Sequence, residues 1–283
     1  MNLDQTAVRE IVRRALAEDL GPDRLDVTSV ATIPADQTDT GDLVARADGV
    51  VAGLDVAAAV FDEASGGTVG FAKKVSDGAR VARGDVLATV AGPTRAILTA
   101  ERTALNLLSR MSGVATHTRA WADALAGTKA LVLDTRKTTP GLRALEKYAV
   151  RAGGGTNKRM GLYDVAMIKD NHTVAAGGIA PAFRLVREAF PDVTIQVEVD
   201  TVAEAVEAVE AGSTFLLLDN MEPHQLREVV AAVDGRAELE ATGGLTLDRA
   251  REFAETGVDY LSVGALTHSS PILDIALDLR PRS

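Results

Sequence analysis

Residues 195–218 read IQVEVDTVAEAVEAVEAGSTFLLL and carry the clearest structural signal in the chain. A short apolar run at 195–199 is followed by a segment with helical spacing at 202–209 and by a second apolar run at 215–218. Apolar strands that alternate with helices are typical of parallel sheets, whose strands are buried on both faces. The stretch therefore predicts part of a parallel α/β sheet.

The same rhythm extends over the second half of the chain. Apolar runs of strand length lie at 130–133, 165–168, 195–199, 215–218, 238–241 and 260–263. Six or seven such strands with intervening helices would close into a TIM-like barrel, complete or incomplete. We therefore expect an α/β fold from residue 130 onward.

The first half of the chain has a different pattern. Residues 1–20 have the spacing of an amphipathic helix that stops at Gly21, and residues 40–98 contain short alternating runs punctuated by glycine. The latter pattern predicts a small antiparallel α+β module. A long helix is expected from 94 to about 125, with a narrow polar stripe of Arg102, Asn106 and Ser109 on an otherwise apolar surface. An arginine on a mostly buried helix would need an anionic partner.

Composition limits the class of protein. The 283 residues suffice for one large barrel or two domains, and with 46% hydrophobic but only 4% aromatic residues the core must consist of aliphatic side chains. The net charge of −10 argues against nucleic acid or an anionic membrane as partner. There is no cysteine, no apolar run of membrane-spanning length and no signal-peptide pattern at the start. We expect a cytoplasmic globular protein.

One stretch inverts the acidic charge. The 36 residues from Asp134 to Lys169 hold eight Lys/Arg against three Asp/Glu, and they include DTRKTTP at 134–140 and GGGTNKR at 153–159. Arginine forks and lysine point charges together suit a ligand with carboxylate and phosphate groups. A solvated basic face is the alternative, but a Gly triplet and a Thr-rich turn after an apolar run favour an anion-binding pocket.

Polar residues stand at the carboxyl ends of the predicted strands, which meet at one mouth of a barrel. Asp200 and Asp219 could instead be helix N-caps. The glycine-containing loops at 242–244 and 262–267 follow the last two strands, where barrel enzymes bind phosphate monoesters through backbone amides. The strand-end residues are Asp134, Lys169, Asp200, Asp219, Thr242, Gly243, Gly244 and Gly264.

Glu198 and Asp219 are candidate oxygen ligands for Mg²⁺ or for sugar hydroxyls. Glu198 shares a strand face with Gln196 and would point into the barrel, so it needs Lys169, Lys137 or a metal as partner. Lys169 itself could be a fixed charge or the Schiff-base amine of an aldolase. His172 and His268 are expected to be hydrogen-bonding loop residues, since no second histidine lies at ligand spacing.

Five motifs together resemble the quinolinate phosphoribosyltransferases, the nicotinate-nucleotide pyrophosphorylases of NAD synthesis. They are EDLG at 18–21 with DVTS at 26–29, ERTALN at 101–106, DTRKTTP at 134–140, IKDNH at 168–172 and LDNM at 218–221. The resemblance implies an N-terminal α/β sandwich at 1–112 joined by the segment 268–283, and an incomplete α/β barrel at 113–267. It also implies a homodimer or higher homo-oligomer in which the N-terminal domain of one subunit covers the barrel mouth of its neighbour, which would explain Arg102.

The resemblance further implies transfer of a phosphoribosyl group from phosphoribosyl pyrophosphate to quinolinate, with decarboxylation to nicotinate mononucleotide, pyrophosphate and CO₂. Lys137, Glu198 and Asp219 would be catalytic, and Glu198 and Asp219 would hold ribose hydroxyls and Mg²⁺, directly or indirectly. The substrate-binding set would also contain Arg102, Arg136, Arg159 and Lys169 around the quinolinate carboxylates, and Thr242, Gly243, Gly244, Ser262, Val263, Gly264, Ala265 and His268 around the 5-phosphate. Thr135 and Lys158 belong to the same substrate-binding set.

Two positions depart from the family pattern: Lys158 stands where many members have His, and Thr242 where many have Ser. The first changes a pocket residue and therefore bears on substrate identity or pH dependence. Within the fold that the resemblance implies, the alternative is a related phosphoribosyltransferase for another pyridine carboxylate or for molybdenum metabolism. From other classes come the Lys169 aldolase and a non-catalytic phosphosugar-binding protein.

Overall fold

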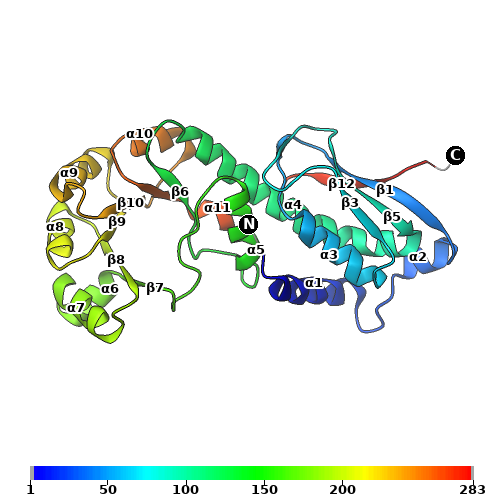
Figure 1. Ribbon diagram of the computed structural model, residues 1–283, viewed down its shortest axis with the longest axis horizontal. Helices are drawn as coiled ribbons and strands as arrows, with labels where there is room; N and C mark the ends of the chain where they lie inside the picture. Colours follow the sequence, from blue (N-terminus) through cyan, green and yellow to red (C-terminus); the bar gives the residue numbers. More distant parts are fainter. Residues whose placement is uncertain (1–2, 282–283) are drawn as a thin grey trace. The chain divides into compact units, whose positions relative to one another are not determined.

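A computed structural model describes residues 3–281 (Figure 1). The chain forms two compact units. The N-terminal unit consists of Met1–Arg119, Thr138–Gly154 and Leu266–Ser283, and the barrel unit of Ala120–Lys137 and Gly155–Ala265. The first two residues of the helix expected at 1–20 lie outside the described residues, and so do the last two of the segment 268–283.

The barrel unit is built on six parallel strands, which confirms the α/β prediction. Their order across the sheet is β6, β11, β10, β9, β8, β7. Within residues 3–281, β6 and β7 are the two edges of this sheet and are not paired with each other, so the barrel is incomplete. The strands are β6 Leu131–Leu133, β7 Val165–Ile168, β8 Thr194–Val199, β9 Phe215–Asp219, β10 Glu238–Thr242 and β11 Tyr260–Ser262.

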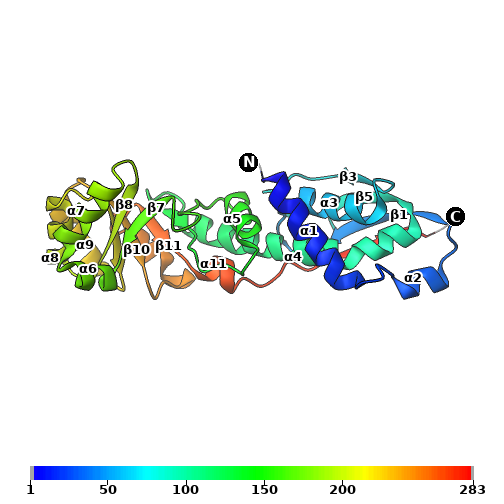
Figure 2. The ribbon, with the colours of Figure 1, turned by 90° about the horizontal axis from the view of Figure 1, so that it is seen from below.

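Burial explains why these runs are strands. Val197, Leu216 and Leu218 are fully buried, as expected for aliphatic strands covered on both faces. Helices follow the strands and lie on the outer side of the sheet in Figure 2; Leu226, Val229 and Val233 are the buried face of one of them. The helices are α6 Asp170–Ala176, α7 Ile179–Ala189, α8 Val202–Glu210, α9 Pro223–Val233, the 3₁₀ turn Leu247–Arg249 and α10 Ala250–Ala254.

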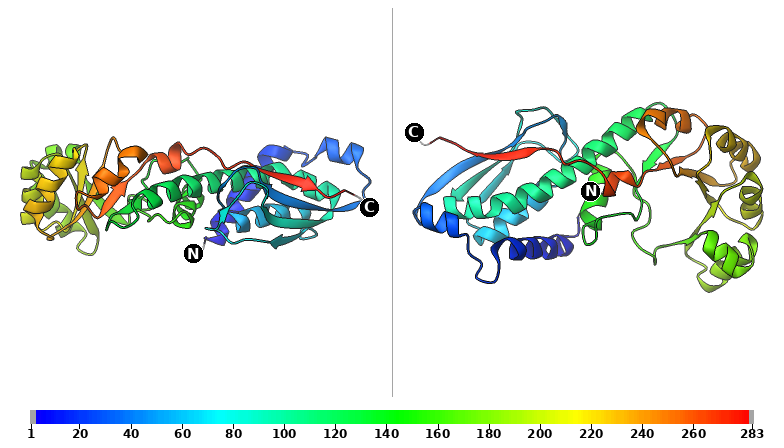
Figure 3. Two further views of the ribbon diagram at one scale, coloured as in Figure 1. Left: turned by 90° about the horizontal axis from the view of Figure 1, so that it is seen from above. Right: turned by 180° about the vertical axis from the view of Figure 1, so that it is seen from behind.

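The N-terminal unit contains the predicted antiparallel module. Its four-stranded sheet has the order β12, β1, β5, β3, and β12 from the end of the chain pairs with β1 (Figure 3). The strands are β1 Thr38–Ala45, β3 Gly70–Lys73, β5 Val86–Pro93 and β12 Ile275–Leu279, with the short pair β2 Gly49–Val50 and β4 Arg80–Val81. The helices are α1 Gln5–Leu20, α2 Val27–Thr32, α3 Leu54–Ser65, α4 Thr94–Ala124, α5 Arg143–Ala152 and α11 Ala265–His268.

Helix α4 is continuous through the expected domain boundary at 112/113. It approaches the returning chain closely at Gly113, where an added Cβ would lie 2.1 Å from the Pro271 carbonyl oxygen. The compact units also group residues 138–154 with the N-terminal unit. The division into 1–112 with 268–283 and 113–267 stays a prediction.

Two expectations for the helices differ from the structure. Arg102 is exposed on α4, so the idea that it lies on a mostly buried surface is wrong for the single chain, whereas Ser109 of the expected polar stripe is buried. The reason is that α4 buries only part of its circumference in its own unit. None of the helices in residues 3–281 combines the length and apolar character needed to span a membrane.

Candidate active site

A cavity of about 660 Å³ lies in the barrel unit and is lined by the ends of its strands and the residues that follow them. Parallel strands place their carboxyl ends on one edge, so side chains far apart in sequence meet there. The lining residues are Thr135, Arg136, Lys137, Lys158, Arg159, Met167, Lys169, Glu198, Leu217, Asp219, Asn220, Thr242, Gly243, Gly244 and Ser262. Arg136, Arg159 and Lys169 thus share one cavity.

Only some of the basic residues of the stretch 134–169 line this cavity. Arg136, Lys137, Lys158, Arg159 and Lys169 line it. Arg143, Lys147 and Arg151 lie instead on helix α5 of the N-terminal unit, where Lys147 is 1% exposed. The basic residues of this stretch therefore serve two places, the cavity and helix α5, because the chain leaves the barrel unit between Lys137 and Gly155.

Two guanidinium groups line the cavity. Arg136 follows β6, and its Nε is buried without a hydrogen-bond partner in the described part of the chain. Arg159 donates from Nη1 to the Val165 carbonyl at 3.1 Å. Burial, and then the charge of Arg136, lower the pKa of Arg159. Like charges held together with an unused donor are a site prepared for an anion.

Lys169 is the partner of the inward-pointing Glu198. Its Nζ lies 2.5 Å from Glu198 Oε2, and the side chain of Glu198 is 13% exposed. Lys169 is thus one of the partners expected for Glu198, and it is in contact with it. An amine held in an ion pair is a fixed charge, and this contact disfavours the Schiff-base alternative. His172 accepts a hydrogen bond from the Lys169 amide through Nδ1, at 3.0 Å, as expected of a hydrogen-bonding histidine. The expectation that it lies in a loop is wrong, because it stands in the first turn of α6.

Lys158 is held by a residue that was not predicted. Its Nζ lies 2.5 Å from Glu240 Oε1, and the two side chains are 8% and 0% exposed. Burial lowers the pKa of Lys158 and raises the pKa of Glu240, while their mutual attraction opposes both shifts. A carboxylate buried to this degree requires a cation beside it. The lysine at position 158 therefore adds a second internal ion pair next to the cavity.

Asp219 provides the second carboxylate of the cavity. Its pKa is raised, by burial first and then by the negative charges of Glu198 and Asp200. Asp200 is exposed, and the N-cap of α8 is Thr201 rather than Asp200, with Glu204 completing a capping box. Mutual repulsion between carboxylates is relieved by a shared cation.

The carboxylates suit a magnesium ion only in part. Residues 3–281 contain no group of three or more acidic or histidine side chains placed to hold a metal ion. Glu198 and Asp219 could supply two oxygen ligands, and Mg²⁺ commonly takes the remainder from water and substrate phosphates. The donor set fits an ion that is shared with a phosphorylated substrate.

The first glycine loop has the conformation that glycine makes possible. Gly243 and Gly244 have φ angles of 85° and 62°, and a Cβ on Gly243 would lie 2.2 Å from Asn220 Oδ1. The loop after β11 is less open, because Val263 is 4% exposed and its amide donates to the Leu133 carbonyl at 3.0 Å. Ser262 lines the cavity, but Val263, Gly264 and Ala265 are not among its lining residues.

Arg102 and His268 belong to the N-terminal unit. Both are exposed, and Nδ1 of His268 lies 2.6 Å from Ser269 Oγ, as expected for a hydrogen-bonding histidine. Their assignment to the substrates stays a prediction.

Sequence reasoning missed four residues at this site. Met167, Leu217 and Asn220 line the cavity, and Glu240 forms an ion pair with Lys158, which lines it as well. Met167 and Leu217 stand two positions before Lys169 and Asp219, so the two-residue period of a strand identifies them as inward-facing. Glu240 precedes Thr242 by the same interval. No local signal pairs it with Lys158.

An apolar cavity of about 630 Å³ shares three of the cations. Arg136, Arg159 and Lys169 line it together with aliphatic residues of β7, α6 and α7, including Met167, Ala175, Leu185 and Val186. The surface next to the cations is therefore suited to a flat apolar ring with acidic substituents.

Comparison with known proteins extends this description. Residues 26–112 match the family described as the N-terminal domain of quinolinate phosphoribosyl transferase, and residues 114–278 match its C-terminal domain. The nicotinate-nucleotide pyrophosphorylase (carboxylating) of Mycobacterium leprae is 52% identical over 278 residues, covering 96% of this chain and 97% of that protein. The corresponding enzyme of Bacillus subtilis, described as probable, is 40% identical over 98% of this chain and 95% of that protein.

Solved structures agree with the fold. The nicotinate-nucleotide pyrophosphorylase of Francisella tularensis superposes with a TM-score of 0.94 at 34% identity and covers 99% of this chain and 98% of that one. NadC of Streptococcus pyogenes gives 0.95 at 37% identity, with 99% of both chains covered. The likeness spans both units and both glycine loops.

Proposed function

The chain belongs to the quinolinate phosphoribosyl transferase family, and on this basis we propose that it transfers the phosphoribosyl group of phosphoribosyl pyrophosphate to quinolinate. Decarboxylation then gives nicotinate mononucleotide, pyrophosphate and CO₂, a step of NAD biosynthesis. The observation that carries the proposal is the meeting of Arg136, Arg159 and Lys169 beside both an apolar wall and the Glu198–Asp219 carboxylates.

Quinolinate combines a flat ring with two carboxylates, and the cation-lined apolar wall matches both features. The unused Nε donor of Arg136 supports a carboxylate at that place. Lys169 remains paired with Glu198 in the chain alone, so it would bridge the substrate and the acidic side of the cavity.

Phosphoribosyl pyrophosphate carries roughly five negative charges, since one phosphate monoester carries nearly two. Gly243 and Gly244 would allow a backbone approach to its 5-phosphate, and Lys137, which lines the same cavity, would stabilise the departing diphosphate. Mg²⁺, held by Glu198, Asp219 and substrate oxygens, would supply additional charge neutralisation for the diphosphate.

The chemistry is a displacement followed by loss of CO₂. The ring nitrogen attacks the anomeric carbon, and the bond to diphosphate breaks with oxocarbenium character that Glu198 favours electrostatically. The carbon–carbon bond to the adjacent carboxylate then breaks, its electron pair stays on the ring carbon beside the charged nitrogen, and a proton from water replaces CO₂. The protein contributes orientation and electrostatics.

We also propose a homodimer in which the N-terminal domain of one subunit contributes Arg102 to the site of the other. The exposed position of Arg102 supports this, because a cation on a bare surface is available to a neighbouring chain. The absence of cysteine from the sequence supports a cytoplasmic location.

Purified protein with Mg²⁺, quinolinate and phosphoribosyl pyrophosphate tests the activity. We expect nicotinate mononucleotide, pyrophosphate and CO₂ in equal amounts. Nicotinate, which lacks the second carboxylate, is the matched control and should not be used. Equal use of nicotinate, or binding without any product, would contradict the proposal.

A further inference from the structure

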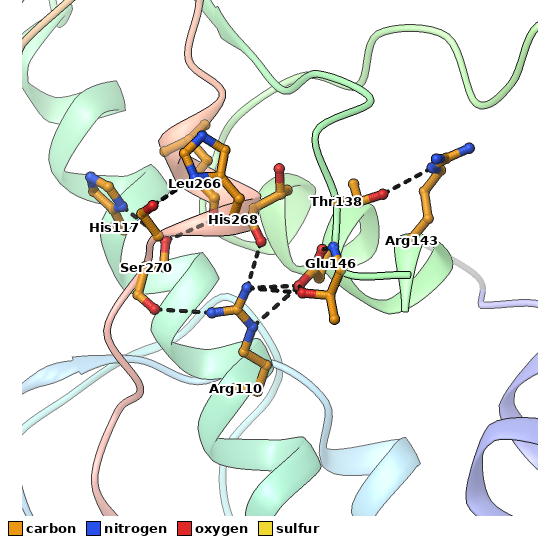
Figure 4. A network of polar contacts seen from close by, with 11 residues as sticks. Arg110, His117, Thr138, Arg143, Glu146, Leu266, His268 and Ser270 are labelled. Atoms are coloured by element: carbon orange, nitrogen blue, oxygen red, sulfur yellow. Dashed lines mark hydrogen bonds and ion pairs between the residues drawn. The ribbon is translucent and has the colours of Figure 1, made fainter. Parts of the chain in front are cut away.

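Helix α4 carries a half-buried arginine, Arg110, whose guanidinium contacts α5, the loop at Thr139 and the segment 267–270 of the N-terminal unit. Arg110 donates from Nε and Nη2 to Glu146 Oε1 on α5, at 3.2 and 2.7 Å. It also donates to the carbonyl oxygen of Thr267 and, from Nη1, to that of Ser270 at 3.0 Å. Figure 4 shows its guanidinium between Glu146 and the 266–270 segment.

Glu146 extends the network to a loop. Its side chain is 1% exposed. Its Oε2 accepts from the Thr139 amide at 2.9 Å, and its Oε1 accepts from the Thr139 hydroxyl at 2.7 Å. One guanidinium and one carboxylate therefore fix the backbone at Thr139 and at Thr267 simultaneously.

Both fixed points directly follow segments of the candidate site. Lys137 stands two residues before Thr139, and Gly264 stands three residues before Thr267. The strands that lead into these segments, β6 and β11, are paired in parallel, with Leu133 opposite Ser262. The Arg110–Glu146 pair thus links the segment after β6 to the segment after β11, beyond the point where the two strands end.

We propose that Arg110 is a positioning residue for the reaction, which sets the loop bearing Arg136 and Lys137 against the loop from Ser262 to Ala265. This inference rests on the proposed function for its kinetic consequence. Lys137 and the loop from Ser262 to Ala265 are assigned to phosphoribosyl pyrophosphate and Arg136 to quinolinate, so misplacement should affect the binding of both substrates and the turnover step.

The chemistry requires arginine rather than a simple cation. The planar guanidinium has five N–H donors and serves one carboxylate and two carbonyls at once, whereas a lysine ammonium on a flexible stem cannot reach all three in the same geometry. Arg110→Lys retains a positive charge for Glu146 and removes the bridge. Arg95→Lys is the matched control, because Arg95 is on the same helix and also donates to backbone carbonyls, those of Val30 and Ile33.

The first measurement does not depend on catalysis. Amide hydrogen exchange is compared in the full-length wild type, Arg110→Lys and Arg95→Lys. We expect faster exchange in peptides covering 135–142 and 263–270 together in Arg110→Lys, and unchanged exchange there in Arg95→Lys. Unchanged exchange in either loop of Arg110→Lys would overturn the inference, whether or not the wild type is active.

The second measurement is the steady-state formation of nicotinate mononucleotide. Arg110→Lys should lower kcat by about 10- to 100-fold and raise the KM for phosphoribosyl pyrophosphate, and the KM for quinolinate should rise as well because Arg136 stands on one of the two loops. Guanidinium ion should partly rescue Arg110→Ala. If kcat and both KM values of Arg110→Lys match those of Arg95→Lys, positioning is refuted. An inactive wild type would refute the proposed function instead. The amide-exchange measurement would then still decide whether Arg110 couples the two loops.

A third variant separates positioning from folding. Arg110→Met with Glu146→Leu replaces the pair by apolar side chains, which often preserves stability at a buried ion pair. We expect a thermal midpoint close to that of the wild type together with the same loss of kcat. Recovery of both stability and kcat in the double variant would show a purely structural role and overturn the proposal.

Discussion

Arg136 combines an unused buried donor with a place beside Arg159, so we expect quinolinate recognition to depend on its guanidinium. We expect Arg136→Ala to lower kcat/KM for quinolinate by about 100-fold, since a bidentate contact to a carboxylate is lost. Arg136→Lys should be intermediate because it keeps the charge without the fork. Arg184→Ala, an exposed arginine of α7 in the same unit, is the control. Near-normal turnover of quinolinate in Arg136→Ala would contradict the assignment.

Lys158 supports a second prediction, on stability and its pH dependence. Lys158→Met leaves the Glu240 carboxylate buried and unpaired, which should destabilise the fold by about 3–5 kcal/mol near neutral pH. Burial already raises the pKa of Glu240 above its ordinary value of 4.5, and loss of the cation raises it further. A group that binds protons more tightly when folded loses stability as pH rises from its unfolded pKa toward its folded pKa.

The loss of unfolding free energy in Lys158→Met, relative to the wild type, should therefore be small near pH 4.5 and grow toward pH 8. Thermal unfolding of the variant and the wild type across this range measures it. Lys158→Met with Glu240→Leu should recover most of the stability at all pH values. A deficit that does not change with pH would mean that Glu240 is not the group responsible.

At the scale of an element, the turn after β10 contains two adjacent glycines in different surroundings. A Cβ on Gly243 would meet Asn220 Oδ1 at 2.2 Å and the Asn220 amide nitrogen at 3.0 Å, whereas a Cβ on Gly244 would have nothing within 4 Å. Both positions have positive φ, which alone costs about 1 kcal/mol for alanine.

Gly243→Ala should therefore destabilise the protein by about 2–3 kcal/mol and displace the β9 end that carries Asp219, with a higher KM for phosphoribosyl pyrophosphate. Gly244→Ala should lose only about 1 kcal/mol. Denaturant unfolding of the pair gives the difference. Equal losses in both variants would show that contact with Asn220 is not the reason for Gly243.

At the scale of the whole molecule, the proposed shared site predicts complementation between two inactive chains. In a mixed dimer of Arg102→Ala and Arg136→Ala subunits, one of the two sites receives both native arginines. If the subunits assemble at random, half of the dimers are mixed, so co-expression should restore about one quarter of wild-type activity. Purified dimers carrying two different tags make the test direct. No recovery above the single variants would place each site within one chain.

The amino-acid sequence by itself determined the elements and the charged residues available to them. The apolar runs at 195–199 and 215–218 became β8 and β9 almost to the residue, because a buried strand is recognised from its own side chains. The candidate cations also followed from sequence, since parallel strands gather their carboxyl ends. Strand periodicity could have added Met167 and Leu217 in the same way.

Only the tertiary structure decided which charges meet. Lys169 contacts Glu198 and Lys158 contacts Glu240, although 29 and 82 residues separate the partners. The structure also divided the basic stretch between a cavity and α5, and it placed Arg110 between Thr139 and Thr267. Local patterns record the burial of each element, whereas pairing between distant side chains depends on the path of the chain through both units, which no short stretch of sequence contains.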